Sequence, residues 1–215
     1  MKDVMEEFAA VTRETGTADT PAGEGRTVVL RRTYRAQVEE VWDALTTAER
    51  INRWFLPISG ELKLGGHYQF EGNAGGEVLG CEPPRLLRVS WVMGEPSPDN
   101  FSEIVVRLTP VDEGTQFELV HTATVPPEMW DQFGPGAVGV GWDGGLLGLG
   151  QHLGDPTWEM SAQEKEAWTF GDEARQFNTA ASEAWGAAWR VAGASDDQVT
   201  AAIAATTAFY VPPSE

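Results

Sequence analysis

The chain has one cysteine, Cys81, among its 215 residues, so no disulfide can form within it. Disulfide-dependent proteins are mostly secreted, and a chain without disulfides is most simply placed in the cytoplasm. Its first residues are acidic and lack the basic-then-apolar order of a signal peptide. No apolar run approaches the roughly 20 residues that cross a bilayer. The sequence therefore predicts a cytoplasmic protein with no membrane partner.

Basic residues are scarce as well. There are 15 Lys and Arg against 33 Asp and Glu, which gives a formal net charge of -18. Nucleic-acid binding needs clustered basic side chains against the phosphates, and anionic membranes attract basic surfaces in the same way. The composition excludes both kinds of partner. We interpret the acidic charge as a solubilising surface.

The motifs of common catalytic and cofactor sites are missing. The glycine-rich turn Gly72–Gly76 lacks the Lys-Ser/Thr of a phosphate-binding loop, and no Gly-x-Ser-x-Gly nucleophile motif occurs. His67, His121 and His152 have no His or Cys partner at metal-ligand spacing, so neither a metal nor a cofactor is predicted. Cys81 has no basic neighbour in sequence to activate its thiol.

Apolar periodicity predicts the elements that are present. A short helix within residues 2–14 and a Thr/Gly/Ala/Pro-rich linker over Thr15–Gly25 form an N-terminal segment, residues 1–25. Two short helices follow the first strand, and the second begins at a capping-box pattern, Thr46–Glu49. The strand candidates are residues 28–35, 59–64, 66–71, 76–81, 86–93, 102–110 and 114–122.

Residues 134–153 predict a long helix despite many glycines. Each interior glycine costs a helix about 1 kcal/mol relative to alanine, so the glycines predict close approach of another backbone or a ligand. The helix is also apolar on its back, which predicts that a tail, residues 154–215, covers it and contacts Asp143. Two capping boxes, Ser161–Glu164 and Ser195–Gln198, predict helices in this tail.

Short motifs accompany these elements in a definite order: Val41–Thr46, Arg53–Phe55, Leu64–Gly66, Cys81–Leu86, Ser90-Trp91 and Leu119–His121. Over residues 26–153 the chain resembles the START-like helix-grip superfamily, which includes polyketide cyclases and lipid-transfer domains. It is most similar to the bacterial branch related to the activator of the heat-shock chaperone ATPase. The resemblance implies an α+β fold, in which a curved antiparallel sheet of about seven strands wraps a long helix and encloses a small-molecule cavity.

Strand alternation and the apolar stripe of the long helix predict which side chains face this cavity. The alternative is that the same side chains only fill a core. The predicted lining residues are Trp54, Phe55, Phe70, Trp91, Ile104, Val106, Phe117, Leu119, His121, Val138, Trp142 and Leu146.

His121 ends an apolar inward row and is the candidate polar group of the cavity, as a ligand contact or an acid/base. The alternative is a histidine that hydrogen-bonds a backbone carbonyl at the strand end. His67 is expected to face solvent. His152 lies near the end of the long helix, where a positive charge would suit the helix dipole.

Three functions follow from these observations. The first is binding of a small hydrophobic or amphipathic molecule between sheet and helix. The second is an enzyme resembling polyketide cyclases or dehydratases, with His121 as its acid/base. The third is a co-regulator of a chaperone ATPase. The tail is expected to pack on its own domain or, in a homodimer, on a partner subunit, and the sequence leaves both open.

Overall fold

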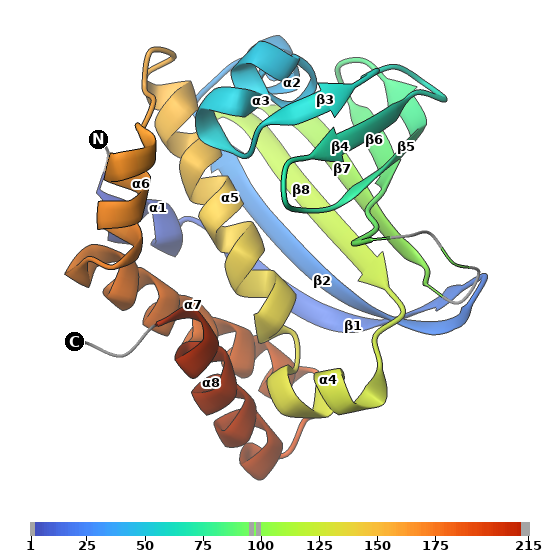
Figure 1. Ribbon diagram of the computed structural model, residues 1–215, viewed down its shortest axis with the longest axis vertical. Helices are drawn as coiled ribbons and strands as arrows, with labels where there is room; N and C mark the ends of the chain where they lie inside the picture. The colour runs from blue at the N-terminus through green and yellow to red at the C-terminus, as the bar shows by residue number, and fades with distance from the viewer. Residues whose placement is uncertain (1–2, 95–96, 98–99, 212–215) are drawn as a thin grey trace.

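The computed structural model describes residues 3–94, 97 and 100–211 (Figure 1). Its strands are β1 (Thr12–Thr20), β2 (Gly23–Tyr34), β3 (Ile58–Gly60), β4 (His67–Phe70), β5 (Gly75–Glu82), β6 (Leu86–Ser90), β7 (Ser102–Val111) and β8 (Gly114–Ala123). Its helices are α1 (Val4–Ala9), α2 (Val38–Thr46), α3 (Ala48–Trp54), α4 (Pro127–Phe133), α5 (Gly136–Gly154), α6 (Ala162–Thr169), α7 (Asp172–Val191) and α8 (Asp196–Tyr210).

The strands form one antiparallel sheet in the order β1-β2-β8-β7-β6-β5-β4-β3. The sheet curves around α5, while α2 and α3 lie near one end of that helix (Figure 1). Leu119 pairs with Leu30 on β2 and with Val106 on β7, and all three side chains are buried. This register places one apolar row of each strand on the concave side. The predicted α+β helix-grip fold is confirmed, with eight strands in place of about seven.

The predicted linker over Thr15–Gly25 is wrong, because most of this segment lies in a β-hairpin. β1 pairs with β2 from Thr12 opposite Arg31 to Thr20 opposite Gly23. β1 is an edge strand that alternates between exposed and half-buried residues, but its half-buried positions carry almost no apolar side chains, so the sequence lacks the apolar alternation of a strand that covers a core. Its composition therefore resembles that of a loop. The N-terminal helix is also shorter than residues 2–14, since it ends at Ala9.

Three predicted helix starts meet different outcomes. Ser161 and Ser195 form the predicted capping boxes with Glu164 and Gln198. The capping box at Thr46–Glu49 is wrong, because Thr47 occupies the cap position and makes no side-chain cap bond. Its hydroxyl instead donates to an Asp43 carboxylate oxygen at 2.6 Å.

Glycines on α5 allow neighbours to approach its backbone closely. A Cβ on Gly148 would lie 2.4 Å from the carbonyl oxygen of Trp54, and a Cβ on Gly139 would lie 2.2 Å from the ring of Trp185. Both distances are shorter than any real carbon contact. The close approach predicted from the glycine content is therefore confirmed, by α3 on one side of the helix and by α7 on another.

A buried carboxylate joins the two ends of the chain to α5. Asp143 is 2% exposed, and its Oδ1 lies 2.8 Å from Nη2 of Arg13 on β1. Its Oδ2 accepts a 2.9 Å hydrogen bond from Nε1 of Trp185 on α7. The predicted contact of Asp143 with the tail is confirmed. The same carboxylate also holds the N-terminal hairpin, which the sequence did not predict.

Alanine at Gly139 should destabilise the fold, while alanine at Gly144 should stabilise it. The Gly139 Cβ would clash with Trp185, and overpacking of this kind lowers the free energy of unfolding by about 2 kcal/mol. At Gly144 a Cβ meets nothing within 4 Å, so the better helix propensity of alanine adds about 1 kcal/mol. Urea unfolding of Gly139→Ala and Gly144→Ala measures both. Equal effects would contradict the packing described for α5.

Asp143→Ala should lower the free energy of unfolding by about 4 kcal/mol, because it leaves the guanidinium of Arg13 buried without a counter-ion. The control is Glu183→Ala, which removes an exposed carboxylate from α7. Surface changes of this kind stay within about 0.5 kcal/mol. Asp143→Ala should also lose less stability when Arg13 is replaced by Met. A loss as small as the control's would show that the ion pair does not hold the chain ends.

Candidate functional site

A cavity of about 330 Å³ lies between the concave face of the sheet, α2–α3 and α5. All predicted lining residues contribute to its wall except His121 and Val138. The wall also contains side chains that were not predicted as lining, among them Trp42, Leu45, Tyr68 and Cys81. Tyr68 could have been found from the sequence, because it alternates with Phe70 on one face of β4. Trp42 and Leu45 follow from the apolar stripe of α2.

No charged side chain lines this cavity within the described part of the chain. Three polar side chains of its wall donate to backbone carbonyls. Tyr68 donates its hydroxyl to the carbonyl of Ser90 at 2.6 Å, and Thr46 donates to the carbonyl of Trp42 at 2.8 Å. The indole N–H of Trp54 donates to the Ala44 carbonyl at 3.0 Å. The surface presented to a ligand is therefore mainly carbon.

Aromatic rings crowd one part of the wall. Phe55 and Trp142 are almost parallel, with an interplanar angle of 7° and centroids 6.4 Å apart. Trp91 lies 5.0 Å from Trp142 and 5.3 Å from Phe70, measured between centroids. Phe55 directly follows α3 and Trp91 directly follows β6, while Phe70 lies on β4 and Trp142 on α5. Their mutual contacts fix the shape of the cavity, because each ring is held by at least one other.

His121 is held in one tautomer behind Trp142. The indole N–H of Trp142 can only donate, and it lies 3.1 Å from Nδ1 of His121, so Nδ1 accepts. The proton of the neutral imidazole is then on Nε2, which lies 2.8 Å from Oγ of Ser102 and donates to it. Burial lowers the pKa of His121 to about 4. The imidazole is therefore neutral at neutral pH.

The prediction that His121 and Val138 line the main cavity is wrong. Both line a second, smaller cavity of about 60 Å³ beside α4. The inward face of β8 was predicted correctly for His121, and so was that of α5 for Val138. The indole of Trp142 lies between these two residues and the main cavity. The expected acid/base role of His121 loses its geometric basis, since both ring nitrogens are engaged and neither faces the main cavity. Ser102 is likewise not activated, because His121 donates to its oxygen.

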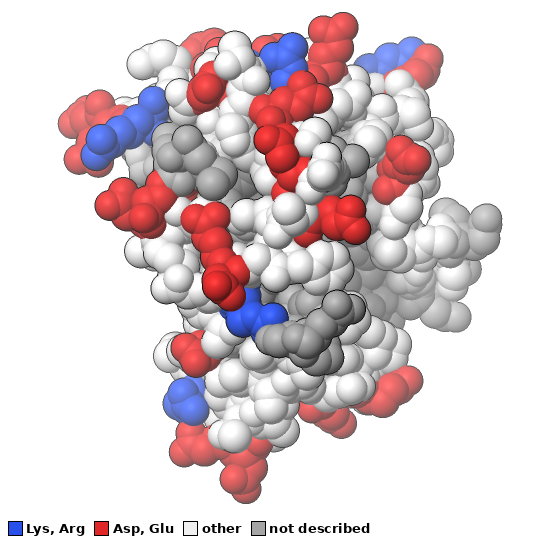
Figure 2. Space-filling model, turned by 60° about the vertical axis from the view of Figure 1, so that its left-hand side comes forward, with Lys and Arg blue, Asp and Glu red and all other residues white. Residues whose placement is uncertain are grey.

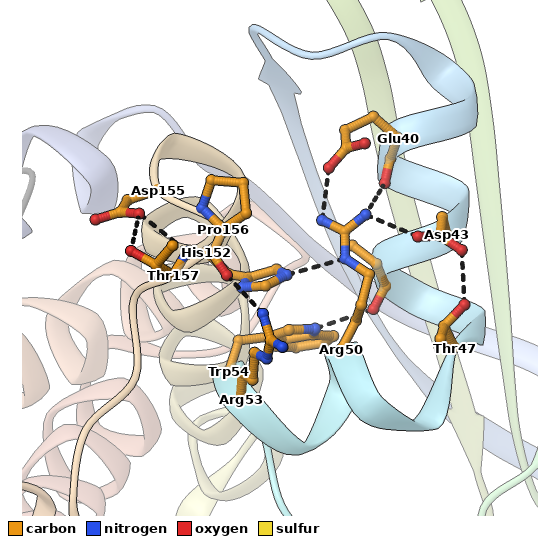
Figure 3. Close-up of polar contacts among 11 residues, drawn as sticks. Glu40, Asp43, Thr47, Arg50, Arg53, Trp54, His152, Asp155, Pro156 and Thr157 are labelled. Atoms are coloured by element: carbon orange, nitrogen blue, oxygen red, sulfur yellow. Dashed lines mark hydrogen bonds and ion pairs between the residues drawn. The ribbon is translucent and has the colours of Figure 1, made fainter.

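Arg50 fastens α3 to the end of α5 (Figure 3). Its Nε donates to Nε2 of His152 at 3.1 Å, and its terminal nitrogens lie 2.6 Å from a Glu40 oxygen and 2.9 Å from an Asp43 oxygen. Burial, followed by the charges of Arg50 and Arg53, lowers the pKa of His152. The expected positive charge at this helix end is therefore wrong, and a neutral imidazole accepts from Arg50. The bond keeps the α3 wall of the cavity against α5.

Three further observations concern metal ligands, membrane spans and His67. Among the residues that the structure describes, no group of three or more His, Cys, Asp or Glu side chains could hold a metal ion. None of the described helices is both long and apolar enough to cross a lipid bilayer. His67 is exposed on β4, as predicted.

A protein family described as Activator of Hsp90 ATPase homolog 1-like protein matches residues 35–154. The chain belongs to this family. The match runs from the end of β2 through α5 and therefore contains every residue that lines the main cavity. It leaves out β1, which provides Arg13 to Asp143, and α7, which provides Trp185. The helices α6 and α8 also lie outside it.

Solved structures show the same similarity. The chain is 41% identical to the crystal structure of CalU16 from Micromonospora echinospora, with a TM-score of 0.57, over 74% of this chain and 96% of that one. For the solution structure of CalU16 the identity is 36% and the TM-score 0.68, over 86% and 97%. Protein MLL2253 from Mesorhizobium loti is 27% identical, with a TM-score of 0.52, over 61% and 98%. Among curated proteins, none matches the chain.

His121 should make this family member less stable in mild acid. Its pKa is about 4 when folded and near 6.5 as a free side chain, so between these values the unfolded chain binds a proton that the folded chain does not. The free energy of unfolding then falls as the pH drops through this window, by up to about 3 kcal/mol. Urea unfolding across the window should show a flatter dependence for His121→Leu. An unchanged slope would contradict the assignment, because His152 contributes equally in both proteins.

Proposed function

We propose that the protein binds a small, uncharged and largely apolar molecule in the cavity between the sheet, α2–α3 and α5. The observation that carries the proposal is a partly open pocket of about 330 Å³ between the sheet and α5, lined mainly by apolar side chains. Small-molecule sites are concave and are lined predominantly by hydrophobic and aromatic side chains, as this pocket is. Its volume falls at the lower end of the range of about 300–1,000 Å³ for small-molecule sites.

The lining supports an uncharged ligand. A carboxylate in this space would meet no cation on the cavity wall, and burial of an unpaired charge costs several kcal/mol. The protein surface adds to this selection. Acidic side chains spread over the face of the molecule in Figure 2, where basic ones are few, in keeping with a net charge of -18. Both effects disfavour anionic ligands such as fatty acids.

The other two functions have less support. An enzyme that uses His121 as its acid/base would need this side chain in the main cavity, and Trp142 stands between them. A role as chaperone co-regulator rests on the description of the family alone. The predicted division of the chain at residues 25 and 153, its cytoplasmic location and the homodimer stay predictions.

A matched pair of variants tests the binding proposal. Val106 points into the cavity from β7, whereas its neighbour Val105 points to the other face of the sheet. Nile red, an uncharged dye that becomes fluorescent in apolar surroundings, should bind to the wild-type protein. Val106→Phe fills the cavity and should weaken binding by about tenfold or more, while Val105→Phe should change it by less than about twofold. Equal affinities for both variants would place the dye elsewhere.

Cys81 provides a second readout without a mutation. It is the one cysteine of the sequence, it is half-buried, and it lines the cavity. A ligand in the cavity should therefore slow alkylation of Cys81 by a thiol reagent in proportion to its occupancy. Native mass spectrometry of the freshly purified protein would show a bound molecule directly. If Nile red binds while Cys81 reacts at an unchanged rate, the dye does not occupy this cavity.

A further inference from the structure

The two cavities lie along the same secondary-structure elements. On β8, Leu119 lines the main cavity and His121, the next residue on that face, lines the small one. On α5, Trp142 lines the main cavity and Val138, one turn earlier, lines the small one. The two cavities share no lining residue. They are consecutive sections of the space beside the concave face of the sheet, one after the other along β8 and α5.

The boundary between the sections is the contact of Trp142 with His121. Their rings meet edge to face, with centroids 5.9 Å apart at 88°, and the indole N–H donates to Nδ1 at 3.1 Å. Ser102 fixes the other side of the imidazole. The indole thus has a bonded partner on the small-cavity side and aromatic neighbours, Phe55 and Trp91, on the main-cavity side. A side chain restrained on both sides keeps one orientation.

We propose that Trp142 is a partition that sets the length of the ligand, and that His121 is the positioning residue that holds it in place. This inference rests on the proposed function, because it assigns the specificity of the same cavity. A linear ligand in the main cavity ends against the indole ring. Without the indole, the same ligand can extend past His121 into the section lined by Val138.

The small cavity is suited to an apolar chain end. Its wall within the described residues has one charged side chain, Arg26, whose guanidinium lies over the ring of Trp130 at 5.1 Å from the centroid, and one neutral polar side chain, His121. The rest of its wall is formed by apolar side chains and glycine. Among the described residues no carboxylate lines this wall, and burial alone lowers the pKa of His121.

A homologous series of straight-chain primary alcohols, competed against Nile red, measures the length limit. Each methylene that enters an apolar site should improve affinity about fourfold, until the chain fills the cavity. In the wild-type protein this improvement should stop at a certain chain length. In Trp142→Ala it should continue for longer chains. Trp142→Leu, which keeps more buried apolar surface, serves if Trp142→Ala does not fold.

Val138→Phe is the matched control, because it fills the small cavity from a residue that is 40% exposed and tolerates a larger side chain. Val138→Phe alone should leave the wild-type length limit unchanged. Added to Trp142→Ala, it should restore a limit near that of the wild type. The same limit in the wild type and in both Trp142 variants would overturn the partition. Wild-type protein that binds neither dye nor alcohols would overturn the proposed function, and the inference with it.

The role of His121 has its own readout, which needs no ligand. The indole ¹H–¹⁵N signal of Trp142 should shift as the pH passes through the His121 titration, since a protonated Nδ1 can no longer accept. His121→Leu should remove this shift, and it should let longer alcohols bind. His121→Asn keeps an acceptor near Nδ1 and should retain a limit closer to the wild type. A Trp142 signal unaffected by both pH and His121→Leu would rule out the positioning role.

Discussion

The fold depends on a helix that has almost no free surface. α5 faces the cavity and α3 on one side and receives the tail on the other, so all of its residues from Gly145 to His152 are buried. A helix enclosed in this way needs residues without bulky side chains where neighbouring elements cross it. Glycine meets this need but lowers the helix propensity. Packing of α5 from two sides offsets that loss. The cavity remains open where α5 carries its larger side chains.

Much of this arrangement could be predicted from the sequence, because inward and outward faces follow from periodicity. The strand alternation that selected Phe117 and Leu119 depends only on the pleat, and it held for the cavity wall. Periodicity does not predict where, along a row of inward-facing residues, a large side chain separates one cavity from the next. For that reason Val138 and His121 were assigned to the right faces but to the wrong side of Trp142. β1 was missed for a related reason, since its half-buried face carries mostly polar side chains and so gives no apolar periodicity.

The polar groups around the cavity share one design. Each donor in the wall that has a described partner is bonded to a backbone carbonyl or, for Trp142, to a neutral imidazole. These bonds stiffen the wall and leave carbon toward the interior. Selection among ligands then depends on volume and shape more than on matched hydrogen bonds. The family to which the chain belongs supplies the frame, and the large aromatic side chains define the space inside it.

The carboxylate of Asp143 ties together two segments that lie outside the family match, β1 and α7. Arg13 of β1 bonds both carboxylate oxygens, and Trp185 of α7 donates to one of them. Loss of either segment would leave a polar group or a charge less well paired in the interior. The two extensions and the aspartate are therefore expected to occur together in related chains. A relative that lacks the tail or the hairpin is expected to carry an uncharged residue at the position of Asp143, so this one alignment column would separate extended members of the family from short ones.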